Sequence, residues 1–343
     1  MAVVSRLLLQ RSLLFNDNVS DDTPFCDWRV TIENCFGGQF VAAVYLAHFI
    51  FSALFVLLCG YILFDRTIRR RQRLFEWSQR ELAFYPKPTE MFVLFAMLFF
   101  ILRAVFAALI FNNVPMSMLA RENWGNAAWP FAAAAIVFYL SGLIFATPHS
   151  YSDIGLTNSG RTLLPSPFQL TSIMFTLVLL PMALNQGLAT AAGVVYDGGN
   201  LKGYGQLVTG LYLMWGIFIV VMFSFYIFFG RQLILILARN IEVFEVNARH
   251  DSSVESLSHG LKTNVFAKRL CEIKRSYNKI RGVVVLIVVL LPVVLITTLS
   301  MTFFRLYIMQ NHTLSFVFAF MWINACAATV AISVVIMGLR SNK

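Results

Sequence analysis

The chain has 343 residues, of which 58% are hydrophobic and 13% charged, with a formal net charge of +10 and a mean hydropathy of +0.71. This composition excludes an ordinary water-soluble domain and predicts an integral membrane protein. Because a helical crossing needs roughly 20 apolar residues, the length allows about seven spans and excludes a large soluble catalytic or DNA-binding domain. Cytoplasmic loops of membrane proteins hold Lys and Arg, so the positive charge does not require a nucleic-acid partner and we expect none.

An N-terminal segment, residues 1–38, precedes the first long apolar run, and we expect it to lie on the exoplasmic side. Its short apolar patch is interrupted by two arginines, so we expect no cleaved signal peptide. Cys26 and Cys35 lie close together in the sequence, and an exoplasmic location favours a disulfide between them over two free thiols. Asn18 begins an Asn-Val-Ser sequon and is the expected glycosylation site.

Seven apolar runs are long enough to cross a membrane as helices, and they lack the short alternating segments of a transmembrane barrel. We therefore predict an all-α fold, a seven-transmembrane helix bundle. The expected spans are residues 39–64, 91–111, 129–146, 168–195, 205–229, 282–304 and 314–338. Basic residues gather in the loop after the first span, in the loop 231–281 and in the stub 339–343. Since cytoplasmic loops hold such residues, the N-terminus should be exoplasmic and the C-terminus cytoplasmic.

The loop after the first span joins a cluster of arginines to Phe75 and Trp77. A positive segment with aromatic anchors beside a span is typical of a helix that lies on the membrane surface. We expect such a helix here, with anionic lipid headgroups as its partner.

Arg103 lies near the middle of the second span, where an unpaired charge is costly. No Asp or Glu falls within the expected spans, so the candidate partners are carbonyls, amides such as Asn324, aromatic faces, water or a lipid phosphate. Two interpretations stay open. Arg103 is either a structural arginine that bridges helices or a ligand or lipid contact, together with Trp322 and Asn324 of the last span.

The absence of carboxylates from the expected spans argues against a proton- or cation-coupled carrier, and a lone His48 favours a helix–helix hydrogen bond over a relay. The last span has no lysine for a retinal Schiff base, and the five histidines are too scattered for a zinc centre. The chain also lacks a phosphate-binding loop and a nucleophile elbow. We expect no metal, no cofactor and no enzymatic activity.

The loop 231–281 should hold a helix that continues the fifth span, then a serine-rich linker, then a basic helix with one apolar stripe. Such a helix can lie on anionic lipid or bind a partner protein. The expected partner-binding residues are Arg231, Lys268, Arg269, Lys274 and Arg275. The serines beside this helix could accept phosphate and change how it binds. These phosphorylation candidates are Ser252, Ser253 and Ser256.

Short motifs give the chain a family resemblance. They are Ile-Leu-Arg-Ala-Val-Phe around Arg103, the aromatic start of the third span at Trp129 and Phe131, and the Gly230, Arg231 and Leu233 positions after the fifth span. In these the chain resembles the GPCR-like superfamily that includes plant tobamovirus-multiplication proteins and animal orphan seven-span lysosomal proteins. The motifs of rhodopsin-like receptors are missing, and a divergent fungal-type receptor stays open as an alternative.

The leading hypothesis is a multi-pass membrane receptor-like protein that signals to or regulates a cytoplasmic partner through its basic loops. A G protein or a small GTPase is the expected partner. A carrier or lipid-handling protein and a ligand-free membrane scaffold are the alternatives. We expect the plasma membrane or an endolysosomal or vacuolar membrane as the location.

Overall fold

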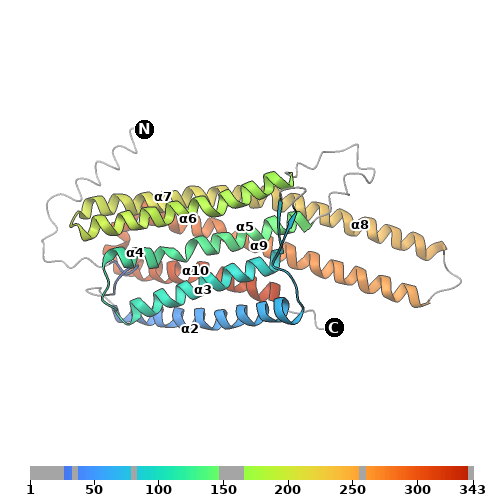
Figure 1. Cartoon of the computed structure of the whole chain (residues 1–343), viewed down its shortest axis with the longest axis horizontal. Helices are drawn as coiled ribbons and strands as arrows, with labels where there is room; N and C mark the ends of the chain where they lie inside the picture. The colour runs from blue at the N-terminus through green and yellow to red at the C-terminus, as the bar shows by residue number, and fades with distance from the viewer. Residues whose placement is uncertain (1–26, 33–37, 79–82, 147–165, 255–259, 339–343) are drawn as a thin grey trace.

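The computed structural model describes residues 27–32, 38–78, 83–146, 166–254 and 260–338. Within them the chain forms a bundle of long helices (Figure 1). Seven helical segments of the described chain are long and apolar enough to cross a membrane, which confirms the predicted all-α, seven-span fold. In chain order the elements are α2 (Gly38–Leu63), the π-helical turn η1 (Phe64–Arg69), β1 (Phe75–Ser78), β2 (Ala83–Pro86), α3 (Pro88–Phe111), α4 (Met118–Ala127), α5 (Trp129–Ala146), α6 (Pro167–Asp197), α7 (Leu201–Phe225), the π-helical turn η3 (Tyr226–Gly230), α8 (Arg231–Val254), α9 (Gly260–Gln310) and α10 (His312–Gly338).

The bundle has two ends, which we name by a residue at each. The Asp27 end holds residues 27–32 and the turns that join α3 to α4, α6 to α7 and α9 to α10. The Arg66 end holds η1 and the two short strands. From the Arg66 end, α8 and the first part of α9 extend beyond the bundle as a pair of neighbouring helices, which we call the α8–α9 hairpin (Figure 1).

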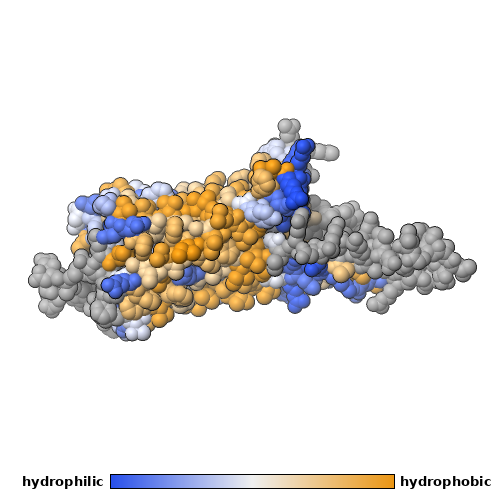
Figure 2. All heavy atoms as spheres, turned by 90° about the horizontal axis from the view of Figure 1, so that it is seen from below, coloured by the Kyte–Doolittle hydropathy of each residue, from blue (hydrophilic) through white to orange (hydrophobic). Residues whose placement is uncertain are grey.

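The outward faces of the helices are apolar. On the face drawn in Figure 2, hydrophobic residues cover the middle of the bundle, and hydrophilic residues lie towards both ends. Leu57 on α2 is 70% exposed, and Ile296 on α9 is 65% exposed. A continuous apolar surface of this extent is unfavourable in water and is typical of a protein surface that meets lipid.

The helical segment that contains the expected third span, residues 129–146, begins before that span. α4 and α5 follow one another with only Ala128 between them, so the continuous segment starts at Met118. Glu122 of α4 lies in this segment ahead of the expected span, and it is fully buried. Hydropathy missed it because the polar side chains of α4 pack against other helices and not against lipid.

Close packing on α6 fixes the position of α4. A Cβ on Gly193 would lie 2.3 Å from the Cα of Leu119, so only glycine allows this approach. Asp197 then accepts hydrogen bonds from the backbone amides of Met118 at 3.0 Å and Leu119 at 3.2 Å. These amides begin a helix and have no partner within it, which is why a carboxylate there is favourable.

The loop after α2 is not the membrane-surface helix that the sequence predicted. After η1 the chain forms an antiparallel hairpin, in which Phe75 lies opposite Pro86 and Trp77 opposite Phe84. The ring of Phe84 packs 6.1 Å from that of Phe138 on α5. Aromatic residues favour strands when one face of the pair is covered, and here α5 covers it. Binding of anionic headgroups by this loop stays a prediction.

Candidate functional site

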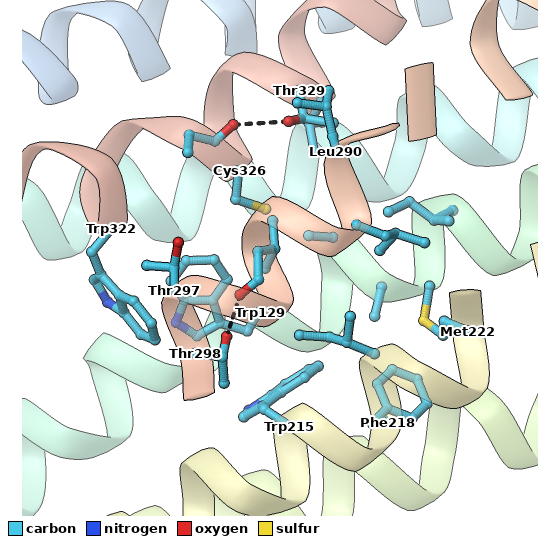
Figure 3. A pocket seen from close by; sticks show the side chains of 18 of the residues that line it. Trp129, Trp215, Phe218, Met222, Leu290, Thr297, Thr298, Trp322, Cys326 and Thr329 are labelled. Carbon is cyan, nitrogen blue, oxygen red and sulfur yellow. Dashed lines mark hydrogen bonds between the residues drawn. The ribbon is translucent and has the colours of Figure 1, made fainter. Parts of the chain in front are cut away.

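An elongated cavity lies between α5, α7, α9 and α10 inside the bundle. Its volume is about 90 Å³, and most of its wall consists of aliphatic and aromatic side chains (Figure 3). Along α7 the lining runs from Tyr212 to Met222, and along α9 from Thr298 to Ile287. At a helical rise of 1.5 Å per residue these stretches are about 15 Å long, so the cavity extends along the bundle axis.

Polar side chains line mainly the part of the cavity nearer the Asp27 end. Thr297 and Thr298 lie there on α9, and Asn126 lies there on α4. The hydroxyl of Thr298 donates to the carbonyl of Val294 at 2.8 Å, and Thr297 donates to Val293 in the same way. Asn126 donates both of its amide hydrogens to Glu122. One goes to the backbone carbonyl of Glu122 and the other to the Glu122 carboxylate. These side chains therefore offer the cavity hydrogen-bond acceptors and keep their donors inside the protein.

A layer of aromatic rings closes the cavity towards the Asp27 end. Trp322 of α10 packs edge-on against Trp129 and Tyr212, with ring centres 5.4 Å and 5.2 Å away. All three residues line the cavity. The predicted ligand residue Trp322 therefore lies in the site (Figure 3).

Arg103 lies behind this layer, buried in α3 and 3% exposed. Its Nε donates to Nε2 of His48 on α2 at 3.1 Å, and its Nη2 donates to the carbonyl of Ile323 on α10 at 3.1 Å. The guanidinium carbon is 5.3 Å from the centre of the Trp129 ring. These contacts join three helices. Arg103 does not line the cavity itself but packs against Trp129, which does. A direct contact between Arg103 and a ligand stays a prediction.

Asn324 contacts His48 and does not line the cavity. Because Nε2 of His48 accepts a hydrogen from Arg103, its Nδ1 must hold the proton and donates to Oδ1 of Asn324 at 3.2 Å. Asn324 in turn donates to the carbonyl of Phe320 at 3.1 Å. Asn324 thus supports Arg103 through His48.

A buried ionic cluster lies beside the cavity at the Asp27 end, and sequence analysis missed it. Asp27 accepts hydrogen bonds from Nε of Arg29 at 2.8 Å and from Nη2 of Arg305 at 2.6 Å. Glu122 accepts one from the hydroxyl of Tyr204 at 2.6 Å and lies 3.8 Å from Arg29. Each of the four charged side chains is at most 6% exposed, and their formal charges cancel. Burying charged groups costs less free energy when each charge is paired with an opposite one.

The cluster fastens residues 27–32 to the bundle. The hydroxyl of Tyr45 on α2 donates to the carbonyl of Trp28 at 3.1 Å. Burial alone would raise the pKa of Asp27, but the neighbouring Arg29 and Arg305 outweigh it and lower that pKa to about 2. Asp27 therefore remains a carboxylate at any physiological pH.

Tyr212 connects the cluster to the cavity. Nη1 of Arg29 donates to its hydroxyl, while its ring lines the cavity and packs against Trp322. The sequence held one signal for this arrangement, an acid and a base two residues apart at Asp27 and Arg29, just before the first span. Their spacing alone does not connect these charges to Arg305, which lies on α9.

The expected partner-binding residues lie at or beyond the Arg66 end. Arg231 begins α8 and is exposed, and Lys274 on α9 forms an ion pair with Glu245 of α8 at 2.5 Å. Arg275 is exposed on α9. Lys268 and Arg269 belong to α9, but the structure does not describe their side chains. Their binding role stays a prediction.

Other predicted sites lie outside what the structure describes. This holds for Cys26, Cys35, Asn18 and Ser256, and for the side chains of Ser252 and Ser253. The backbone of the last two belongs to α8, which runs to Val254 and so extends into the segment that we expected to be a linker.

Among the described residues, no group of three or more His, Cys, Asp or Glu side chains could hold a metal ion. Comparisons with protein-family models, with curated proteins and with solved structures found no match to this chain.

Proposed function

We propose that the protein is a receptor-like, non-enzymatic membrane protein that needs no cofactor. In this proposal a small ligand occupies the cavity, and the α8–α9 hairpin acts on a cytoplasmic partner such as a G protein or a small GTPase. One observation carries the proposal: the helices that line the cavity also form the hairpin. α7 continues through η3 into α8, and the same α9 that supplies Thr298 to the cavity extends to Gly260 in the hairpin.

Close contacts between α7 and α9 give a physical basis for coupling. A Cβ on Gly216 would lie 3.1 Å from a methyl carbon of Leu299, and one on Gly230 would lie 3.0 Å from a methyl carbon of Val284. Helices that approach this closely move against one another as rigid bodies when one of them shifts. A ligand wedged between α7 and α9 would therefore change the relative position of α8 and the outer part of α9.

The proposed topology places the Arg66 end in the cytoplasm and the Asp27 end on the exoplasmic side. Arginines of η1 and the basic residues of the hairpin support this orientation, because such residues stay on the cytoplasmic side. The proposed location is the plasma membrane or an endolysosomal or vacuolar membrane. Anionic headgroups are the proposed lipid partner of the Arg66 end.

A carrier or lipid-handling function is the second candidate. The buried Glu122, which accepts a hydrogen bond from Tyr204 and contacts the cavity-lining Asn126, favours it, because buried carboxylates in helix bundles can couple transport to protons. Flux of a lipophile across vesicles that contain the purified protein, absent from vesicles with Glu122→Gln, would support a carrier over a receptor.

Proximity labelling in cells tests the receptor proposal. A labelling enzyme is inserted within residues 255–259, and the labelled proteins are compared for the parent and two variants. Ala325→Leu adds three carbons to the cavity lining, and Val317→Leu is the control that places a leucine on the exposed face of α10. We expect G-protein, small-GTPase or kinase-scaffold partners to be labelled. Their labelling should change in Ala325→Leu and stay as in the parent in Val317→Leu. If none of these partners is labelled above background in the parent, the proposal is wrong.

A further inference from the structure

Residues 27–32 are held against the bundle by their side chains, as a bound peptide is. Asp27, Trp28, Arg29 and Val30 are each at most 5% exposed. The segment is neither a helix nor a strand, and its one turn is closed by a hydrogen bond of 2.9 Å from the amide of Val30 to the carbonyl of Asp27. Its position therefore depends on the surface of the bundle that surrounds it.

Polar side chains of four helices form that surface, which we call the segment-binding surface. Nη2 of Arg305 donates to the carboxylate of Asp27 at 2.6 Å. Glu122 lies 3.8 Å from Arg29, and the hydroxyl of Tyr212 accepts a hydrogen bond from Arg29. The surface thus matches an acidic side chain and a basic side chain two positions later. Its members are Tyr45 on α2, Arg121 and Glu122 on α4, Tyr204 and Tyr212 on α7, and Arg305 on α9.

The segment-binding surface also holds the residues between and after these two charges. The ring of Trp28 belongs to one hydrophobic cluster with Tyr45, whose hydroxyl donates to the carbonyl of Trp28 at 3.1 Å. Nη1 of Arg121 donates to the carbonyl of Val30 at 2.9 Å. Every peptide has such carbonyls, so these contacts would serve any peptide that adopts the same turn, while the charges would select its sequence.

Residues 27–32 leave one donor of this surface unused. Nε of Arg305 is buried and has no hydrogen-bond partner within the described part of the chain. A carboxylate that met Nε and Nη2 together would form the stronger, two-point contact. Asp27 does not make this contact, because both of its oxygens also accept hydrogen bonds from Arg29. The surface is therefore able to bind a carboxylate better than the segment supplies it.

We propose that the segment-binding surface is a peptide-binding site, which residues 27–32 occupy as a tethered ligand. A separate peptide with an acidic, an aromatic and a basic residue in succession competes for it, as Asp27, Trp28 and Arg29 stand in the chain itself. The inference goes beyond the proposed function and does not rest on it, because peptide binding needs neither a ligand in the cavity nor a cytoplasmic partner.

Peptide binding to the full chain in phospholipid nanodiscs tests the proposal. The probe is a fluorescent hexapeptide with blocked ends and the sequence of residues 27–32, Asp-Trp-Arg-Val-Thr-Ile. Its Kd is measured by fluorescence anisotropy for the parent and for the double variant Asp27→Asn/Arg29→Gln, whose own segment lacks both charges. We expect binding to the double variant to be about tenfold tighter or more, because a tethered competitor acts at a high effective concentration until it is weakened.

Two matched peptides test the role of the charges. Asn-Trp-Gln-Val-Thr-Ile lacks both charges, and Arg-Trp-Asp-Val-Thr-Ile exchanges them. Each should bind the double variant about tenfold more weakly than the hexapeptide or worse, as expected when charged hydrogen bonds are lost. Adding Arg305→Gln to the double variant should remove most of the preference for the acidic residue.

A thiol introduced by Val30→Cys reports release of the segment in a chain that is otherwise the parent. Val30 is 2% exposed, so a maleimide should react at position 30 only when the segment leaves the surface. The hexapeptide at about 10 mM, above the roughly millimolar effective concentration of a short tether, should accelerate this reaction several-fold. Leu201→Cys is the control, because Leu201 is 54% exposed at the same end of the bundle and its reaction rate should not change.

Two results would overturn the inference, and the first can be obtained even if the double variant does not fold. One is a reaction rate at position 30 that the hexapeptide does not raise, which would make residues 27–32 a permanent part of the bundle. The other is equal acceleration or equal affinity for the hexapeptide and the charge-exchanged peptide, which would make the binding independent of the paired charges.

Discussion

Arg29 donates a hydrogen bond to the hydroxyl of Tyr212, whose ring is also part of the cavity wall. The N-terminal segment and the cavity therefore share one side chain. Tyr212 ties the position of residues 27–32 to the shape of the site, because a shift of its ring would break its contact with Arg29.

The Tyr212→Phe variant tests this link. The substitution removes the acceptor and leaves a buried donor of Arg29 without its partner, so we expect a loss of about 1 to 3 kcal/mol in unfolding free energy. The loss is measured from the change in Tm of the purified protein. Tyr61→Phe is the control, since Tyr61 is 64% exposed, and it should leave Tm unchanged. Equal Tm values for both variants would show that the bond contributes nothing.

Asp27 should be the most sensitive residue of the cluster. Asp27→Asn leaves Arg29 and Arg305 buried with Glu122 as the nearby carboxylate, and breaking a buried pair in this way costs about 3 to 5 kcal/mol. Adding Arg305→Met to Asp27→Asn should restore part of the stability, because it removes one unpaired charge. Additive losses in the double variant, measured by denaturation, would contradict a direct coupling of the two side chains.

The dependence of stability on pH follows from the same carboxylate. The pKa of Asp27 is lowered in the folded protein to about 2, so its contribution is present above the ordinary pKa of 3.8 and is lost as the pH falls towards 2. Tm should therefore not change through Asp27 between neutral pH and the mildly acidic range, and should fall below about pH 4. Asp27→Asn should lack this component of the fall. An equal fall in the variant would assign it to other groups.

Arg103→Leu and Arg103→Lys separate the two interpretations of the arginine in the second span. Arg103→Leu leaves His48 and the Ile323 carbonyl without their donor, at about 1 to 3 kcal/mol for each group that finds no replacement. Arg103→Lys keeps the charge but loses the planar donor pair. A structural role predicts that Tm and folded yield fall in step with labelling of the hairpin partner. Normal Tm with loss of that labelling would instead indicate a ligand contact.

The approach of α4 to α6 depends on one glycine. Gly193→Ala would place a Cβ 2.3 Å from the Cα of Leu119, and because backbone cannot yield as a side chain does, we expect a loss of about 1 to 3 kcal/mol or more. Gly187→Ala on the same helix is the matched control, since its Cβ would meet nothing within 4 Å. Its Tm should equal or exceed that of the parent, as alanine favours helix. If the Tm of Gly193→Ala is as high as that of Gly187→Ala, the close approach of α4 to α6 does not require glycine.

Hydropathy was sufficient to predict the seven spans, because lipid-facing residues such as Leu57 and Ile296 must be apolar wherever the partner helices lie. It did not indicate the burial of Glu122 and Asn126 in α4, which depends on contacts with other helices that only the tertiary structure defines. The helix predicted after α2 was wrong for a similar reason, since the packing of Phe84 on α5 favours a strand.

The cavity and the ionic cluster could not be derived from sequence periodicity. They unite residues far apart in the chain, such as Asp27 with Arg305 and Tyr212 with Trp322. Each residue alone has an ordinary explanation, and only the fold brings them together. Trp322 of the last span lines the cavity, whereas Asn324, two residues on, contacts His48 of α2.

The pairing of Asp27 with Arg305 also constrains how the protein is assembled. Asp27 emerges from the ribosome long before Arg305, which lies near the end of α9, the sixth candidate span. Until α9 has been inserted, Asp27 lacks one of its two cationic partners, and the segment 27–32 cannot reach its final position against α4, α7 and α9. Closure of the Asp27 end is thus a late step in biogenesis, so a chain that stalls before the sixth span keeps its N-terminal charges open to water and to the quality-control machinery of the membrane.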